Sequence, residues 1–594
     1  MLDRLWRDPG RLALAIALVA TAAIYAPTIG RGIVSYDDPW LVRDNWIVAH
    51  PSWSSLRAIA FDLDPDTRFA LGAEYLPVRD VSVMFDHALW GSWYGGFHLT
   101  NLAIYLAAIA AWFSALTQFG IDRRIAGVTA LLWALHPTHA ESVAWLAERK
   151  GLLGALCAGV AAWGYARFRV GDSLRWLALA TCAAVCAVWS KAPAAFAIAA
   201  LAGLELALPA RRRSLRRSAV GLCVIAGASL AAFAPVVAVA LRASIVGGDS
   251  DAPAGYLAMA VGGHGFYLEL AGMALPNAAS YPIATSGPTG VDLALGAVGL
   301  TAIAAVVFAP RSGRFAPSGA LRAAAILWLA CWFPISRLVL PLHAVLVADR
   351  YLLFPTLGVA LALASGLMRI ANPRVRAIAI AAVAAAAAAR SLAAQESWQD
   401  SAALWQRAVE SNPADGAAWS MYAEALADAG QREAAARAVD EGLRNSGAPR
   451  LLLRKALLVL DSGERAGGLR LMREAADAGE PRAMSNLALL LLDDHQLDEA
   501  RAWASRGAAA QPMYAPGHRT HGKVALAAQA FDEAHAAFRR AYALEPANLT
   551  NRYNLGIVLA KLGWRDEARP QFAACLGDPR LAPLAQRALA ELGW

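Results

Sequence analysis

Long apolar runs fill the first two thirds of the chain and end near residue 395. A helix that crosses a bilayer needs about 17 to 25 mostly apolar residues. We therefore predict about eleven spans and an all-α, polytopic membrane bundle over residues 1–395. The predicted spans are residues 11–30, 97–117, 124–140, 152–168, 174–190, 192–209, 218–241, 289–309, 319–335, 351–368 and 377–394.

Two apolar segments allow a second interpretation. The run 12–26 follows three arginines and could pass for a signal peptide, but we interpret it as a retained first span because later spans need it for parity. The segment 256–276 is apolar enough to cross, yet a crossing there would break the alternation of the loops. We interpret it as a re-entrant or interfacial helix.

The charges between the spans predict the topology. The chain carries a net charge of +8, but its basic residues cluster in short connections such as 211–217. Such clusters mark the cytoplasmic side and do not indicate a nucleic-acid-binding face. Alternation then places a first outer loop at about 31–96 and the soluble part, 396–594, outside the cytoplasm. We expect an integral protein of a bacterial inner membrane, in contact with membrane lipids and not with nucleic acid.

From residue 416 onward the sequence repeats with a period near 34, the length of a tetratricopeptide helix pair. Small and aromatic packing positions recur in two successive units: Gly522, Ala534 and Phe538, then Gly556, Ala568 and Phe572. We predict about five repeats that stack into an α-solenoid. Its concave groove is expected to bind a protein or peptide, and a spacer or oligomerisation module is the alternative.

The first outer loop carries candidate acids. Asp37 and Asp38 come directly after the first span, where water meets a low-dielectric wall. This setting raises the pKa of a carboxyl group and suits a general base, although a solvated pair or a helix cap is the alternative. Pro39 predicts an extended backbone at Asp38. Glu74 and Asp80 are candidates for a second acid.

Four cations stand at the outer ends of predicted spans: Arg149, Lys150, Lys191 and Arg350. A lipid phosphate would lie at this depth, and a guanidinium fork matches its oxygens. Lys191 lies in a tight turn between two apolar helices, where a charge needs water or an anion. Simple snorkelling to the interface is the alternative for Arg350.

Other polar residues of these loops are weaker candidates. His136, His139 and Glu141 in HPTHAE could suggest a metal site, but their spacing is not that of a zinc helix and a proline interrupts it. We predict no metal site and treat a divalent metal as unnecessary. His98 and Asp349 complete the candidates, each at the mouth of a span.

Several stretches together resemble one family. They include SYDDPWLVRDN, YLPVRDVSVMFDHALW, LHPTHAESVAWLAERKG, WSKAPAAF and ADRYLLFP, followed by the repeats. In this order they are similar to the transmembrane and tetratricopeptide-repeat O-mannosyltransferases and their bacterial relatives, which are C-type glycosyltransferases related to the protein O-mannosyltransferases. The resemblance covers nearly the whole chain.

The resemblance implies an inverting transfer of a sugar, mannose being one candidate, from a polyprenyl-phosphate donor to a hydroxyl acceptor such as protein Ser or Thr. It implies an acidic catalyst at Asp37 or Asp38 and no further cofactor. Two positions depart from the family: Ala192 stands where an acid is expected after Lys191, and Asp349 replaces a glutamate. The missing acid at Ala192 argues against a metal-binding or donor-binding role for this turn.

Two other functions remain. The chain could be a non-catalytic scaffold whose repeats recruit envelope proteins, although eleven spans exceed what an anchor needs. A transporter would place charges near the bilayer midplane, and here the charges gather at the outer ends of the spans.

The topology generates the first test. A reporter fused after residue 594 should lie outside the cytoplasm, because the arginine-rich connections alternate. Alkaline phosphatase fused there should be active. A fused green fluorescent protein that fluoresces, together with an inactive phosphatase fusion, would contradict the predicted orientation.

Overall fold

The computed structural model describes residues 8–171, 173–208, 214–242, 255–312, 316–336, 338 and 347–593. These residues form helices joined by turns, with no strand among them, as predicted. Contacts divide the chain into two compact units, Met1–Asn412 and Pro413–Trp594. The first unit thus continues past residue 395, because helix α19 (Ser401–Ser411) hydrogen bonds to Ser35 and belongs to it.

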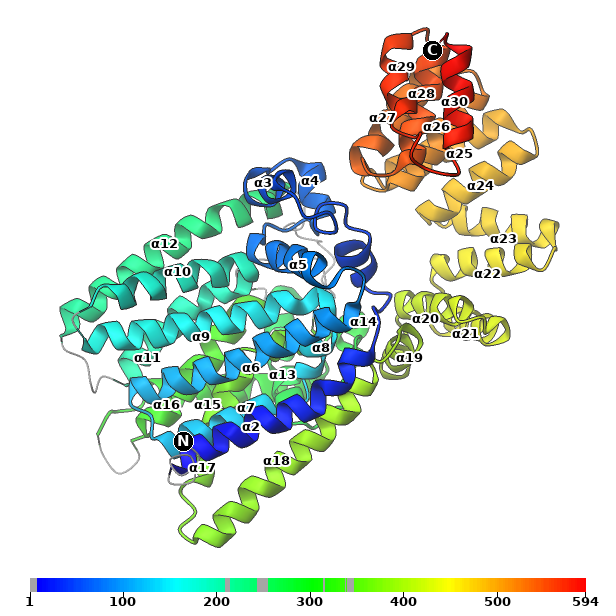
Figure 1. Cartoon of the computed structure of the whole chain (residues 1–594). Coiled ribbons are helices and arrows are strands. Elements are labelled where there is room, and N and C mark those ends of the chain that lie inside the picture. The colour runs from blue at the N-terminus through cyan, green and yellow to red at the C-terminus, as the bar shows by residue number, and fades with distance from the viewer. Residues whose placement is uncertain are drawn as a thin grey trace. The chain divides into compact units, whose positions relative to one another are not determined.

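Long helices of the first unit run along a common direction (Figure 1). They are α2 (Pro9–Tyr25), α6 (Tyr94–Phe119), α9 (Arg149–Val170), α10 (Arg175–Ser190), α12 (Leu215–Arg242), α15 (Gly290–Phe308), α16 (Gly319–Trp332) and α18 (Pro373–Glu396). Shorter helices pack among them: α7 (Arg123–Ala134), α11 (Ala197–Ala207), α13 (Gly255–Ala271) and α17 (Pro355–Leu367). Short elements gather toward one end of the bundle: α3 (Trp53–Phe61), α4 (Pro65–Ala70), α5 (Pro77–Trp90), α8 (His139–Ala144), α14 (Ile283–Ser286) and α19.

Seven segments of the described chain are long and apolar enough to cross a membrane: Pro9–Gly30, Tyr94–Phe119, Leu146–Val170, Leu215–Arg242, Gly290–Phe308, Gly319–Ser336 and Pro373–Glu396. Arg175–Ser190, Ala192–Ala207 and Pro355–Leu367 are shorter apolar helices at three more predicted spans. The predicted span 124–140 is wrong in its extent. There α7 has only 12 residues, and the chain turns before α8.

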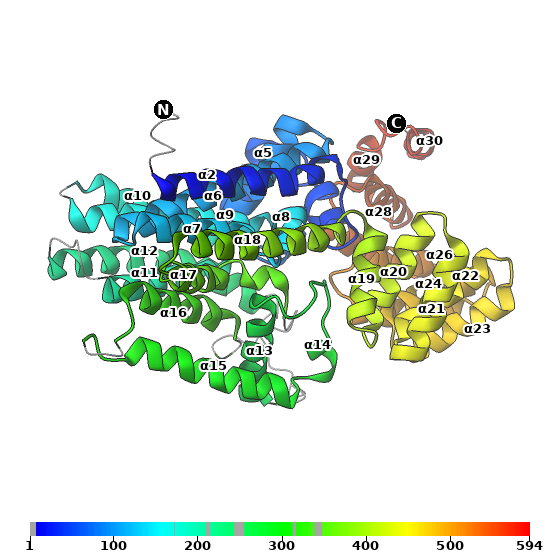
Figure 2. The same ribbon diagram turned by 90° about the horizontal axis from the view of Figure 1, so that it is seen from below.

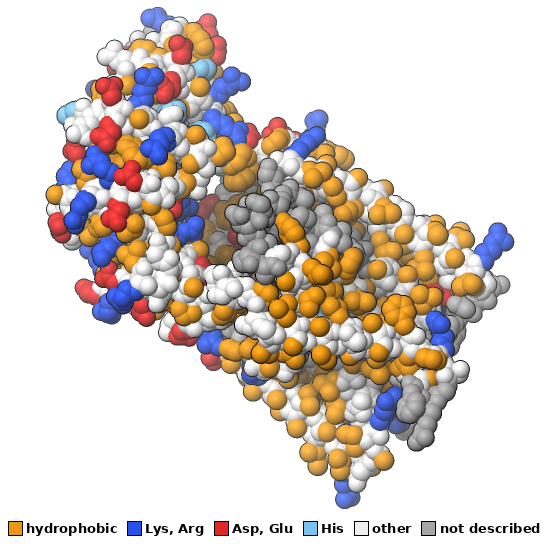
Figure 3. Space-filling model, turned by 180° about the vertical axis from the view of Figure 1, so that it is seen from behind, with side chains coloured by type: hydrophobic (Ala, Val, Ile, Leu, Met, Phe, Trp, Pro, Cys, Tyr) orange, Lys and Arg blue, Asp and Glu red, His pale blue; other side chains and the backbone are white. Residues whose placement is uncertain are grey.

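The surface of these helices is apolar. Only 11% of the most apolar stretch of α15 is buried inside the protein, and Val298 of this helix is 68% exposed. Ile378 of α18 is 69% exposed. Figure 3 shows hydrophobic side chains covering the bundle, whereas the repeat unit presents many charged ones. Apolar area of this extent is typical of a surface that contacts lipid or another apolar partner.

Glycines allow two helices of the bundle to touch. A Cβ atom added to Gly10 of α2 would lie 2.2 Å from the carbonyl oxygen of Arg123, and one added to Gly127 of α7 would lie 2.4 Å from that of Gly10. Backbones that approach so closely gain dispersion contacts. Figure 2 shows α2 beside α18, which ends at the site described below.

The second unit is a chain of helix pairs. Residues 413–593 contain α20 (Gly416–Asp428) with α21 (Arg432–Ser446), α22 (Pro449–Asp461) with α23 (Arg465–Asp477), α24 (Pro481–Asp493) with α25 (Leu497–Ala510), α26 (Ala515–Ala527) with α27 (Phe531–Leu544), and α28 (Leu549–Lys561) with α29 (Arg565–Ala573), before α30 (Ala582–Glu591). The pairs begin where the predicted repeats begin. Gly522 lies against Phe538, and Gly556 against Phe572, as the repeat pattern predicts.

This contact generates a stability test. A Cβ atom at Gly522 would lie 2.7 Å from the Phe538 ring. Gly522→Ala should therefore destabilise the repeat unit by about 1–3 kcal/mol through overpacking, a cost that the higher helix propensity of alanine reduces by about 1 kcal/mol. Gly577→Ala is the control, because open space surrounds Gly577. Thermal unfolding followed by circular dichroism measures both variants, and a midpoint of Gly522→Ala above that of the wild type would refute the contact.

Candidate active site at one end of the bundle

The loop after α2 is tied down by Asp38. This side chain is 1% exposed, and its carboxylate accepts hydrogen bonds from the backbone N–H of Val34 at 3.2 Å and of Ala147 at 2.9 Å. Burial raises the pKa of Asp38 to about 7. Asp38 therefore fastens the first outer loop to the segment that precedes α9.

The backbone prediction for Asp38 is wrong. Its φ of −59° and ψ of −39° are helical, and it precedes the π-helical turn η2 (Pro39–Arg43). A following proline disfavours this conformation without forbidding it, and here the two hydrogen bonds to the carboxylate hold it.

Asp37 points to different surroundings. It is partly exposed, and its carboxylate accepts one long hydrogen bond, 3.3 Å, from Trp40 Nε1. Burial raises its pKa, while the positive charges of Lys150 and Arg350 act against that rise. Of the two predicted acids, Asp37 thus has the carboxylate whose charged form nearby cations favour, and Asp38 is held by the backbone.

Aromatic rings surround this loop. Tyr36 stacks on Trp145 with ring centroids 4.7 Å apart, and Trp405 of α19 meets Tyr36 edge-on at 5.3 Å. Trp145 also stacks on Trp398 at 5.7 Å. The guanidinium carbon of Arg350 lies 5.3 Å from the centre of the Trp145 ring, a cation–π distance. The rings join the loop, α19 and Arg350 into one packed group.

Arg350 is held by Glu141. The Glu141 carboxylate, 2% exposed on α8, accepts from the backbone N–H of Arg350 at 2.7 Å and pairs with its guanidinium. Burial would lower the pKa of Arg350, but Glu141, together with Tyr351, Tyr36 and Glu148, outweighs burial and raises the pKa well above its usual range. Sequence reasoning considered Glu141 only as a metal ligand.

Asp349 is a buried acid beside this pair. Its carboxylate accepts from Asn277 Nδ2 at 2.7 Å and from the Tyr281 hydroxyl at 2.6 Å. Burial, and then the charge of Glu141, raise its pKa to about 8. Burial beside Glu141 thus favours the protonated form of the Asp349 carboxyl group.

Lys191 is paired with an anion, as its position in a turn between two apolar helices requires. Its ammonium group pairs with Glu148 of the turn η3 (Leu146–Glu148), which is fully buried. Burial lowers the pKa of Lys191 and Glu148 opposes this shift. Sequence reasoning did not identify Glu148 as a site residue. The acid absent at Ala192 is supplied from 43 positions before Lys191 in the chain.

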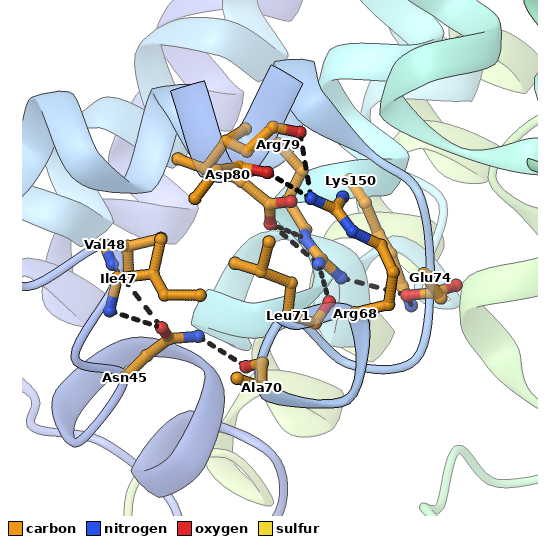
Figure 4. A network of polar contacts seen from close by, with 12 residues as sticks. Asn45, Ile47, Val48, Arg68, Ala70, Leu71, Glu74, Arg79, Asp80 and Lys150 are labelled. Atoms are coloured by element: carbon orange, nitrogen blue, oxygen red, sulfur yellow. Dashed lines mark hydrogen bonds and ion pairs between the residues drawn. The ribbon is translucent and has the colours of Figure 1, made fainter. Parts of the chain in front are cut away.

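Glu74 joins a second group of charges, drawn in Figure 4. Its carboxylate pairs with Lys150 at 2.8 Å and with Arg79 at 2.9 Å, and Arg79 also pairs with Asp80 at 2.7 Å. Burial would raise the pKa of Glu74, but Lys150 and Arg79 outweigh it and lower it. Asp80 is buried and paired with Arg79. Of the two candidates for a second acid, Glu74 is therefore the more exposed.

Arg149 does not belong to this group. Its side chain is 1% exposed; it donates to Asn101 Oδ1 at 2.6 Å and to the carbonyls of Ser82 and Phe97, and it pairs with Asp86. These partners occupy the guanidinium inside the protein. The prediction that Arg149 binds a phosphate is therefore not supported by its surroundings, and we assign it a structural role.

The three candidate histidines also make internal hydrogen bonds. His98 and His136 bond to the carbonyls of Gly32 and Ala271, and His139 bonds to the hydroxyls of Tyr105 and Thr356. Among the described residues, no group of three His, Cys, Asp or Glu side chains is arranged to hold a metal ion.

A narrow cavity opens behind the cations. Lys191, Arg350 and Tyr351 line one part of it, and Trp112, Cys331 and Phe354 belong to its apolar remainder. The space among these side chains is about 20 Å³, room for one water molecule, so an anionic group joined to a hydrocarbon chain would fit only after the lining moves apart.

Comparisons with known proteins concern the repeats. No family model and no curated protein matches the chain. Solved structures similar to part of it include YrrB, a TPR protein with an unusual peptide-binding site, at 19% identity over 32% of this chain and 100% of that chain, with a TM-score of 0.26. A thermophilic TPR protein of Thermus thermophilus, TTC0263, is 21% identical over 30% of this chain and 99% of that one, with a TM-score of 0.25. Likeness at this level says nothing of the function of this chain.

The contrast between two neighbouring cations can be tested. Arg149→Met should cost about 3–5 kcal/mol of stability, because it leaves Asp86 buried without its cation. Lys150→Met should cost about 1 kcal/mol or less, because its pair with Glu74 is partly exposed. Thermal unfolding in detergent compares the two variants. Equal losses would contradict the structural role of Arg149.

Proposed function

We propose that the chain is a membrane glycosyltransferase that moves a sugar from a polyprenyl-phosphate donor to a hydroxyl group on the outer side of a bacterial inner membrane. The observation that carries the proposal is the position of Asp37. Its carboxylate is partly exposed, and the positive charges of Lys150 and Arg350 favour its charged form. Arg350 also borders an apolar cavity. An acid, cations and an apolar cavity are what this substrate class requires.

The donor would bind with its phosphate at Arg350 and Lys191. Glu141 accepts hydrogen bonds from the backbone N–H and from one side-chain nitrogen of Arg350. Because a guanidinium has five N–H donors, Arg350 can also donate to phosphate oxygens. The isoprenoid chain would leave through the apolar cavity toward lipid. Lys150 would add positive charge from the side of Glu74.

In the proposed step Asp37 accepts the proton of the acceptor hydroxyl while that oxygen forms a bond to the anomeric carbon. The bond between this carbon and the phosphate oxygen breaks, and polyprenyl phosphate leaves with both electrons. Arg350 and Lys191 stabilise the charge that grows on the leaving oxygen. A single displacement inverts the configuration of the sugar. Asp38 acts through the loop, by fixing the direction of Asp37.

The repeat unit supports a further part of the proposal, the binding of a protein or peptide acceptor. Stacked helix pairs of this kind form extended concave surfaces, and such surfaces commonly bind other polypeptides. The same unit is compatible with a second function, a scaffold for envelope proteins that transfers no sugar.

The acid is tested by Asp37→Asn. We expect turnover to fall about 10²–10⁴-fold with donor binding nearly unchanged, because only the proton acceptor is lost. Asp38→Asn should also reduce turnover, but with a loss of thermal stability, since its carboxylate holds two backbone N–H groups. Transfer from polyprenyl-phosphate sugars to a peptide in reconstituted membranes measures both variants. Turnover near wild type in the double variant, at matched expression, would show that neither Asp37 nor Asp38 is the base.

The pH profile gives an independent check on the same residue. Asp37 must be ionised to accept a proton, and its pKa is raised, so kcat/KM should fall as pH drops through a value above the usual pKa of about 3.9. Asp37→Asn should remove this acid limb. A limb that survives in the variant would assign it to another group.

The two-unit arrangement predicts a separation of roles. Deletion of residues 413–594 should leave donor binding intact and change which acceptors are used. The reason is that the repeats pack against one another and form a compact unit separate from the candidate site. Donor binding by titration and transfer to a peptide panel measure the two roles. Loss of donor binding in a folded truncated protein would contradict the separation.

A further inference from the structure

A second cavity, of about 390 Å³, opens in the first unit beside the candidate site. It lies among the end of α18, helix α19 and the segment after α13 that contains Asn277. Its volume falls within the range of about 300–1,000 Å³ that is usual for ligand sites. Nothing in the proposed donor binding uses this space.

The cavity is lined by polar side chains of several kinds. They are the amides of Asn277, Gln399 and Gln406, the carboxylates of Glu396 and Glu410, the guanidinium groups of Arg390 and Arg407, and the hydroxyl of Ser397. Hydrogen-bond donors and acceptors are therefore both present, with charges of both signs. Pro276 and three alanines, Ala393, Ala394 and Ala403, supply the apolar remainder of the lining. An isoprenoid chain would still desolvate the polar groups without compensation, so this lining suits the donor lipid poorly.

Two contacts connect the cavity with the ion cluster. Asn277 lines the cavity and donates from Nδ2 to Asp349 at 2.7 Å, and Asp349 directly precedes Arg350. On the other side, Trp398 lies between two lining residues and stacks on Trp145, the ring beneath Arg350. The lining of the cavity thus contacts Asp349 and Trp145, the two neighbours of Arg350.

Helix α19 also connects the cavity with the catalytic loop. Gln406 and Arg407 line the cavity, and the adjacent Trp405 donates from Nε1 to the carbonyl of Ser35 at 3.2 Å and contacts Tyr36. Tyr36 is followed by Asp37 in the chain. A molecule held in the cavity would lie against the helix that positions the proposed base.

We infer that this cavity binds the acceptor, and that the acceptor is an extended polypeptide segment carrying Ser or Thr. A peptide backbone alternates N–H and C=O groups. Gln406 already donates to Glu410 and Asn277 to Asp349, but each of these amides keeps a second N–H and its oxygen for such a backbone. The inference rests on the proposed glycosyl transfer and adds the place where the acceptor binds. The repeats would then bind a different part of the acceptor protein from the segment that is modified.

Gln406→Trp tests the inference, because Gln406 is exposed on α19 and a larger ring would fill the cavity without entering the core. In reconstituted membranes we expect the KM for a Ser- or Thr-containing peptide to rise about tenfold or more, a loss of roughly 1.4 kcal/mol, with the KM for the donor unchanged. The control is Arg374→Trp, an exposed position at the opposite end of α18.

Unchanged peptide KM in Gln406→Trp would overturn the inference, and so would a rise confined to a saccharide acceptor. A peptide with a photoreactive group separates this result from failure of the proposed function. Cross-linking to α18 or α19 that is abolished by Gln406→Trp would support the peptide site. It would do so even if the protein transferred no sugar; that result would contradict the proposed glycosyltransferase activity but not the peptide site. Cross-linking equal in wild type and variant would refute the site.

Discussion

Buried charge at one end of the bundle is the constraint on which the candidate site depends. Lys191 and Arg350 stand where apolar helices meet, and a charge there is stable only with a partner and hydrogen bonds. Glu148 and Glu141 supply these partners from the segment between α7 and α9. The same segment gives its backbone N–H at Ala147 to Asp38. One short stretch of chain therefore holds both cations and the acidic loop.

This arrangement divides similar residues by role. Asp37 and Asp38 are adjacent, yet one faces cations and the other is enclosed by backbone donors. Arg149 and Lys150 are adjacent, yet one is saturated inside the protein and the other is partly exposed beside Glu74. Chemistry at such a site depends on which member of each pair keeps hydrogen-bonding capacity for a substrate, and burial decides this.

Local patterns could be read from the sequence, and contacts between distant segments could not. The repeat register was predictable because Gly522 and Phe538 recur with a fixed period. The need of Lys191 for an anion was predictable from its apolar neighbours, but its partner, Glu148, comes from a turn elsewhere in the chain. The backbone of Asp38 was predicted wrongly, because tertiary hydrogen bonds outweighed the preference that Pro39 imposes.

The proposed function joins an acid, cations and an apolar cavity into one reaction, and the wild-type protein tests this most directly. The full chain, purified and placed in lipid vesicles, is incubated with a panel of polyprenyl-phosphate sugars and a Ser- and Thr-containing peptide, and the products are identified by mass spectrometry and by nuclear magnetic resonance of the anomeric centre. We expect one glycopeptide whose sugar has the configuration opposite to that in the donor, formed together with polyprenyl phosphate. Retention of configuration, or no transfer from any donor by folded protein, would contradict the proposed function.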